Sequence, residues 1–99
     1  MCGIAGQINL IKDLKKNFLI NKSLSHRGPH NQKAIRLRKN IIFYHTRLKI
    51  IDLTDGSNQP MSSENYRYTI VYNGELYNFK EIKNNLEKKG HVFNSNGDT

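Results

Sequence analysis

The sequence predicts one small domain of the α+β class, with strands that pair mostly in an antiparallel manner. Its 99 residues supply enough chain for a single modest core. Segments with strand character outnumber those with helical character by roughly five to two. Short polar turns join neighbouring strand segments, and hairpins of this kind imply antiparallel pairing.

The first two expected elements are a strand and a helix. Residues 3–10 (GIAGQINL) are small and β-prone, which predicts a buried strand. Residues 13–25 predict a helix, for which Asp13 is a plausible N-cap. The apolar residues of this segment recur near helical spacing, at Leu14, Phe18, Leu19 and Leu24.

A loop and a hairpin follow. Residues 26–32 (HRGPHNQ) predict a loop, because Gly28-Pro29 interrupts any helix. AIRLR at 34–38 and IIFYHTRL at 41–48 both have strand composition, and Lys39-Asn40 between them predicts the turn of a hairpin.

The second half begins with a loop and returns to strand. Residues 53–65 (LTDGSNQPMSSEN) are rich in turn-forming residues. Residues 67–78 (RYTIVYNGELYN) predict a strand followed by a turn at Asn73-Gly74, a dipeptide suited to positive φ.

A helix and a short strand complete the pattern. Asn78 is expected to cap the helix of FKEIKNNLEKKG, and Gly90 stands where that helix should stop. Three apolar residues share one face of this helix, at Phe79, Ile82 and Leu86. HVF at 91–93 predicts a further strand.

The composition excludes several classes of protein. Only 36% of the residues are hydrophobic and the mean hydropathy is −0.70, so no window approaches the roughly 18 apolar residues that cross a bilayer. The start MCGIAGQINL lacks the pattern of a secretory leader. One cysteine excludes an internal disulfide, and four histidines show no metal-ligand spacing. We therefore expect a cytoplasmic protein without a membrane partner or a metal site.

The net charge of +8 suggests a nucleic-acid-binding protein at first sight. The basic residues are concentrated in 12–49, which contain eleven Lys and Arg against one acid. The chain is also rich in Lys, Asn and Ile, a composition typical of an AT-rich genome, and it contains no known nucleic-acid motif. We expect no nucleic-acid partner, and the opposite hypothesis would require salt-dependent binding.

Cys2 is the residue with the sharpest chemical signal. Removal of Met1, which a small second residue permits, would place the Cys2 thiol beside a free α-amine. Such an amine can take the thiol proton, so that one residue supplies both nucleophile and base. The alternative is a chance cysteine in a disordered start. Gly3 and the strand behind it favour the catalytic interpretation, because a strand fixes the terminus in place.

Six spaced motifs carry a resemblance to a known family: MCGIAG, SHRGP, HTRLKIIDL, GSNQP, VYNGELYN and GDT. In this order they resemble the amino-terminal glutamine amidotransferase domain of the class II, N-terminal-nucleophile type. Within that type the match is to the branch of the glutamine-hydrolysing asparagine synthetases. Related class II enzymes resemble H-x-R-Y/W-A/S-T and H-N-G at places where this chain has HTRLKI and YNGELYN.

The resemblance implies glutamine amide hydrolysis and assigns roles to matching residues. Cys2 would attack the side-chain amide of glutamine and release ammonia. The Asn73 amide and the Gly74 N–H would hold the oxyanion of each tetrahedral intermediate. Arg47 would bind the α-carboxylate, with Glu75 and Asp98 binding the α-ammonium. The segment that would line the substrate pocket is Leu48, Lys49, Ile50 and Ile51.

His26, Arg27 and His45 lie in motifs, and we assign them no proton-transfer role. His30 departs from the family pattern, which usually has Asp after Arg-Gly-Pro, and this departure affects the local loop more than the chemistry.

The family fold is a four-layer αββα sandwich of antiparallel sheets, of which residues 2–99 would be the front part. The resemblance implies that the rest of this domain and a synthetase domain are absent from the 99 residues. No cofactor is expected in this chain, since ATP and Mg would bind in that synthetase domain. The alternative hypothesis is a truncated, non-catalytic remnant or an interaction module of the same fold. Activity of the 99 residues alone is doubtful, because both sheets would lack strands.

Overall fold

The computed structural model describes residues 1–8 and 14–99. It is an α+β structure with antiparallel sheets, as the sequence predicts. The elements are β1 (Gly3–Ile8), α1 (Leu14–Leu24), β2 (Asn31–Leu37), β3 (Ile41–Arg47), β4 (Met61–Ser62), β5 (Thr69–Ile70) and α2 (Phe79–Glu87), with short 3-10 helices at Ser25–Arg27 and Asp55–Ser57. The expected N-cap Asp13 lies outside the described residues.

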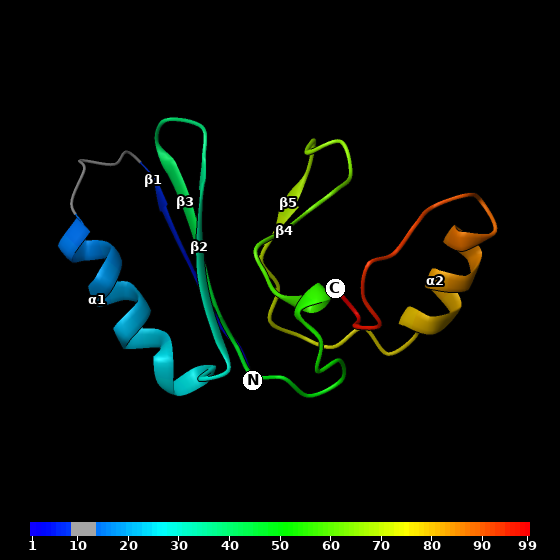
Figure 1. Cartoon of the computed structure of the whole chain (residues 1–99), viewed down its shortest axis with the longest axis horizontal. Helices are drawn as coiled ribbons and strands as arrows, with labels where there is room; N and C mark the ends of the chain where they lie inside the picture. Colours follow the sequence, from blue (N-terminus) through cyan, green and yellow to red (C-terminus); the bar gives the residue numbers. More distant parts are fainter. Residues whose placement is uncertain (9–13) are drawn as a thin grey trace.

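The first half of the chain forms a three-stranded antiparallel sheet in the order β1-β3-β2. The expected hairpin of β2 and β3 is confirmed, and its turn contains Arg38 at φ 58°. Helix α1 packs against β1 and β3 (Figure 1). The register sets Gly3 opposite Thr46 and Asn31 opposite Arg47. The start of β1 and the end of β3 therefore lie side by side at the same end of the sheet.

Strand β3 carries the core because it is the central strand. Ile42 and Tyr44 are the buried hydrophobic side chains found in the described part of the chain. Towards its end β3 buries polar side chains instead, at His45, Thr46 and Arg47. The Thr46 hydroxyl donates to the Leu24 carbonyl at 2.9 Å, which links the strand to the end of α1.

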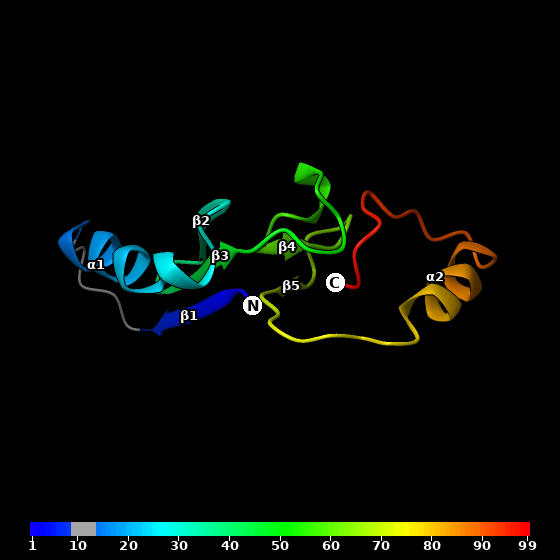
Figure 2. The ribbon, with the colours of Figure 1, turned by 90° about the horizontal axis from the view of Figure 1, so that it is seen from below.

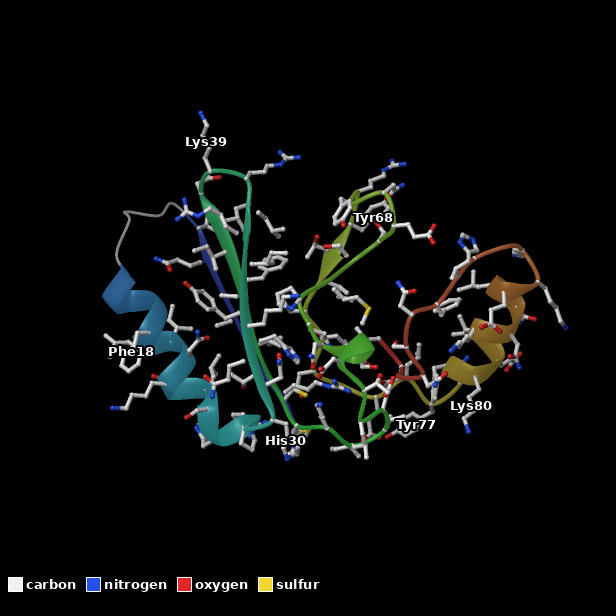
Figure 3. All side chains as sticks on the ribbon, in the orientation of Figure 1. Phe18, His30, Lys39, Tyr68, Tyr77 and Lys80 are labelled. Atoms are coloured by element: carbon white, nitrogen blue, oxygen red, sulfur yellow. The ribbon has the colours of Figure 1, made fainter. Side chains whose placement is uncertain are left out.

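The expectation that the first strand is buried was wrong. β1 lies at the edge of the sheet, and its Ile4 and Ile8 are 44% and 68% exposed. Side chains alternate between the two faces of a strand, and Ile4 and Ile8 lie on the face opposite to that of Gly3, whose position faces Leu24 at the end of α1. Helix α1 is confirmed, but Phe18 is 66% exposed and points away from the sheet (Figure 3).

The second half is more open. β4 and β5 form a two-residue antiparallel pair, and α2 lies at the end of the molecule opposite α1, as both ribbon views show (Figures 1 and 2). The strand expected before the Asn73-Gly74 turn is limited to Thr69–Ile70. The strand expected at 91–93 was wrong, because no neighbouring strand in the described part pairs with that segment.

Helix α2 confirms the expected boundaries. Asn78 occupies the N-cap position, where its carbonyl accepts the Ile82 N–H at 3.2 Å, although its side chain makes no capping bond. Gly90 has φ +90° and ends the turn after the helix, as expected. Within the described residues, no helix combines the length and apolar character that a membrane span requires.

Candidate active site

A pocket of about 420 Å³ opens where β1 begins and β3 ends. Its volume falls within the usual range for small-molecule sites. Four segments line it, at residues 1–2, 47–59, 72–77 and 97–99. Both ribbon views place the N-terminus midway along the long axis of the molecule (Figures 1 and 2). The lining residues are Met1, Cys2, Arg47, Leu48, Ile50, Ile51, Asp52, Ser57, Gln59, Tyr72, Asn73, Gly74, Glu75, Tyr77, Gly97, Asp98 and Thr99.

The Cys2 thiol is half-buried in this pocket and is the free cysteine of the chain. The Leu48 N–H donates to the Cys2 Sγ at 3.4 Å, and the Sγ lies 3.8 Å from the Leu48 carbonyl oxygen. The antiparallel register of β1 and β3 explains the contact, because it brings the start of one strand to the end of the other. These two contacts with Leu48 hold the sulfur in a fixed position in the pocket.

Arg47 is a buried cation at 5% exposure. Its Nη1 donates to the Thr54 carbonyl at 2.6 Å and to the Asn58 Oδ1 at 2.8 Å, and its Nη2 donates to the Asp52 carbonyl. All of these acceptors are uncharged. The one ion pair among the described residues joins Lys49 to Asp55, so Arg47 has no carboxylate partner there. A buried guanidinium without a counter-ion beside a pocket suits an anionic ligand.

Two carboxylates besides Asp52 line the same pocket. Asp98 is half-buried, and its Oδ2 accepts the Leu76 N–H at 3.0 Å. Glu75 is exposed. Neither forms an ion pair within the described part of the chain. Arg47, Glu75 and Asp98 therefore all line the pocket without an ion-pair partner among the described residues. This arrangement suits the α-carboxylate and the α-ammonium of an amino acid.

Asn73 and Gly74 line the pocket on an irregular segment after β5. The expected positive φ was wrong, since neither residue has one. Gly74 instead lies close to the end of the Tyr72 side chain. A Cβ at position 74 would come within 2.7 Å of the Tyr72 hydroxyl oxygen, so a larger residue would displace the Tyr72 ring.

Lys49 is the one predicted pocket residue that does not line the pocket. Its Nζ lies 3.1 Å from the Asp55 carboxylate, and its N–H donates to the His30 Nδ1 at 3.0 Å. His30 lies at the turn before β2 (Figure 3). The ring nitrogen of His30 thus links the start of β2 to the segment that follows β3.

Sequence reasoning missed three buried polar residues at the site: Asp52, Ser57 and Gln59. The Asp52 carboxylate accepts the N–H of Asn96, the N–H of Thr54 and the hydroxyl of Ser57, each at 2.8 Å. These donors, Asn96 foremost, hold the pKa of Asp52 well below its usual range. The motifs HTRLKIIDL and GSNQP contain these residues, and that was the signal that could have found them.

Gln59 joins two of the lining segments. Its side-chain oxygen accepts the Tyr72 N–H at 2.5 Å, and its amide donates to the Thr99 hydroxyl at 3.1 Å. The side chain is 5% exposed. Because Tyr72 directly precedes Asn73 and Gly74, this bond fixes the start of the segment that carries them.

His45 is fully buried behind the pocket. Burial lowers its pKa, the Tyr72 backbone acts against this change, and the charge of Arg47 reinforces it. The imidazole is therefore neutral at physiological pH. The described residues contain no cluster of three or more His, Cys, Asp or Glu suited to a metal ion.

Comparison with known proteins identifies the family. The sequence model of the family described as glutamine amidotransferase domain matches residues 1–99. The chain belongs to this family. It is 38% identical to asparagine synthetase [glutamine-hydrolyzing] 1 of Bacillus subtilis (strain 168), over 100% of this chain and 16% of the relative.

Eukaryotic relatives match over the same region. The glutamine amidotransferase chain is 35% identical to asparagine synthetase [glutamine-hydrolyzing] 2 of Oryza sativa subsp. japonica, over 99% of the chain and 17% of the relative. It is 32% identical to a probable asparagine synthetase [glutamine-hydrolyzing] of Dictyostelium discoideum, over 99% and 18%. The chain thus spans less than a fifth of the length of these relatives.

Proposed function

We propose that this glutamine amidotransferase chain hydrolyses the side-chain amide of glutamine and supplies the ammonia to an amidation of the asparagine synthetase type. The observation that carries the proposal is the pocket that gathers Cys2, Arg47, Asn73 and Asp98. Membership of the family and the similarity to glutamine-hydrolysing asparagine synthetases support it.

The nucleophile in this proposal is Cys2, at the N-terminus once Met1 is removed. The α-amine takes the thiol proton while the sulfur attacks the amide carbon, and the first tetrahedral intermediate collapses to a thioester as the proton passes to departing ammonia. Water then adds to the thioester carbonyl, and the sulfur leaves as glutamate is released. The Asn73 side-chain amide and the Gly74 N–H hold the oxyanion in both steps.

Substrate recognition rests on charge. The unpaired Arg47 guanidinium binds the α-carboxylate, while Asp98 and Glu75 bind the α-ammonium. Leu48, Ile50 and Ile51 line the pocket around the aliphatic part of the substrate. Arg47 and Asp98 each keep hydrogen bonds to the protein, so the pocket holds them in place before glutamine binds.

The proposal extends to the wider protein. The chain contributes to a cytoplasmic four-layer αββα sandwich, in which further strands complete both sheets. A synthetase domain is the partner that consumes the ammonia, and ATP and Mg²⁺ would bind there.

The test uses protein expressed from its natural reading frame. Intact mass should show a chain that begins at Cys2, and the protein should release glutamate and ammonia from glutamine. Cys2→Ala should abolish the release but retain glutamine binding in calorimetry, because the recognition charges remain. Ser63→Ala, on the β4–β5 hairpin, should leave both unchanged. Persistent hydrolysis in Cys2→Ala, or a retained Met1 in active enzyme, would contradict the proposed mechanism.

A further inference from the structure

We propose that Asp52 is a positioning residue that sets the relative placement of Arg47 and Asp98 and so determines the selectivity of the pocket for an α-amino acid amide. This inference rests on the proposed function. It assigns to Asp52 a role in substrate recognition although its side chain would touch no substrate atom.

The first observation concerns the loop that holds Arg47. The Asp52 and Thr54 carbonyls both accept hydrogen bonds from the guanidinium. The Asp52 carboxylate shapes this loop from within, because Oδ1 accepts the Thr54 N–H and Oδ2 accepts the Ser57 hydroxyl, each at 2.8 Å. The carboxylate thus fixes the two carbonyls that aim the guanidinium.

The second observation concerns the segment that carries Asp98. The same Oδ2 of Asp52 accepts the Asn96 N–H at 2.8 Å, two residues before Asp98. Gly97 between them packs against Ser57, where a Cβ would come within 2.8 Å of the hydroxyl oxygen. The buried Asp52 carboxylate therefore connects the loop that holds Arg47 with the segment that carries Asp98.

The third observation is that this carboxylate cannot be exchanged for its amide without conflict. Asp52 is 6% exposed, and its hydrogen-bond donors, from Thr54, Ser57 and Asn96, are all uncharged. In Asp52→Asn the new NH₂ group must face a backbone N–H, of Thr54 in one orientation and of Asn96 in the other. Neither backbone donor can turn away, unlike the Ser57 hydroxyl. Either the loop that holds Arg47 or the segment that carries Asp98 must therefore shift.

The experiment compares two amides in the protein expressed from its natural reading frame. Glutamine carries both charged α-groups, whereas glutaramate has the same reacting amide and lacks the α-ammonium. In Asp52→Asn the KM for glutamine should rise about tenfold with kcat changed less than about threefold. The preference for glutamine over glutaramate in kcat/KM should fall by a similar factor. A merely structural role would lower the active fraction and leave that ratio unchanged.

Two further variants make the test decisive. Glu64→Gln is the matched control, since it makes the same carboxylate-to-amide change at an exposed residue of the β4–β5 hairpin, and it should leave the preference intact. Ser57→Ala removes one donor from Asp52 and should shift the preference in the same direction by a smaller factor. If Asp52→Asn fails to fold, this variant carries the test. An unchanged preference in the folded variants overturns the inference, whereas a wild-type protein without glutamine hydrolysis overturns the proposed function itself.

Discussion

Arg47 combines a structural role with the recognition role proposed for it. Its guanidinium is buried, and its hydrogen bonds end on uncharged oxygens of the 52–58 loop. These bonds hold the group in place but do not neutralise it. An entering carboxylate would therefore gain a charge-assisted interaction without waiting for the cation to reorganise.

The roles of Arg47 and Asn73 should separate in kinetics. Arg47→Ala should raise the KM for glutamine by about 10- to 100-fold, because a charge-assisted pair is lost from the bound substrate. Asn73→Ala should instead lower kcat by about 100-fold or more, because the oxyanion exists only along the reaction path. Steady-state assays of glutamate release measure both constants.

The control for these variants is Arg67→Ala, which removes an exposed cation from the β4–β5 hairpin and should change neither constant. If Arg47→Ala and Asn73→Ala altered KM and kcat to the same extent, the roles assigned to the two residues would be wrong.

At the scale of elements, the pocket depends on irregular segments held by buried polar side chains. The segment of Asn73 and Gly74 follows the two-residue strand β5 and has no regular structure of its own. The bond from the Tyr72 N–H to the Gln59 side chain replaces the ladder that a longer strand would supply. The Gln59 side chain therefore fixes the backbone before Asn73 and Gly74, as hydrogen bonds between paired strands fix the backbone elsewhere in the chain.

Gln59→Leu should consequently impair turnover rather than binding. The change leaves the buried Tyr72 N–H without its acceptor and loosens the residues that would hold the oxyanion, so kcat should fall about tenfold with little change in KM. Gln59→Glu keeps the acceptor and should retain most of the turnover. Gln32→Leu, on the exposed face of β2, is the control. A rise in KM at constant kcat would show that Gln59 acts on the binding end instead.

The elements that the sequence predicted well are those whose signal is local. The β2–β3 hairpin has strand-forming residues on both sides of a short polar turn. Helix α2 has a residue suited to capping at its start and a glycine after its end. The strand at 91–93 failed because strand composition says nothing about whether a partner strand is present. β1 was misjudged as buried because small, apolar residues do not reveal which side of the sheet is covered.

The sequence motifs predicted most of the residues that line the pocket. Cys2, Arg47, Asn73 and Asp98 line it, whereas Lys49 turns to Asp55. Asp52, Ser57 and Gln59 could not be singled out, although they lie inside the same motifs. Polar residues in loops usually face solvent, and the hydrogen bonds that turn these three inward exist only after distant segments have met.

At the scale of the whole molecule, the 99 residues form an extended arrangement around a small core. The radius of gyration is 14.6 Å, and the extents are 45 × 28 × 18 Å. A compact domain of this length has a radius of gyration of about 13 Å. Ile42 and Tyr44 are the buried hydrophobic side chains of the described part, whereas Ile8, Leu53 and Val92 are each 68% exposed.

The 99-residue polypeptide expressed alone should therefore lack a cooperative unfolding transition. Two buried apolar side chains cannot offset the conformational entropy lost by a chain of this length. The exposed edges of β1 and β2 leave backbone donors and acceptors unpaired, which favours association even though a net charge of +8 keeps chains apart. Asp98 would be held weakly, since Asp52 and Leu76 must first be in place.

Thermal unfolding followed by circular dichroism, and binding of a hydrophobic dye, measure this directly. We expect a broad transition, strong dye fluorescence and glutamate release at least 100-fold below that of the protein from its natural reading frame, since a misplaced catalytic geometry alone costs about that factor. Cys2→Ala of the same polypeptide corrects for background hydrolysis. A sharp, concentration-independent transition with Cys2-dependent turnover near that of the longer protein would show instead that the pocket assembles from these four segments unaided, because their polar links alone would then suffice to hold Arg47, Asn73 and Asp98 around the thiol.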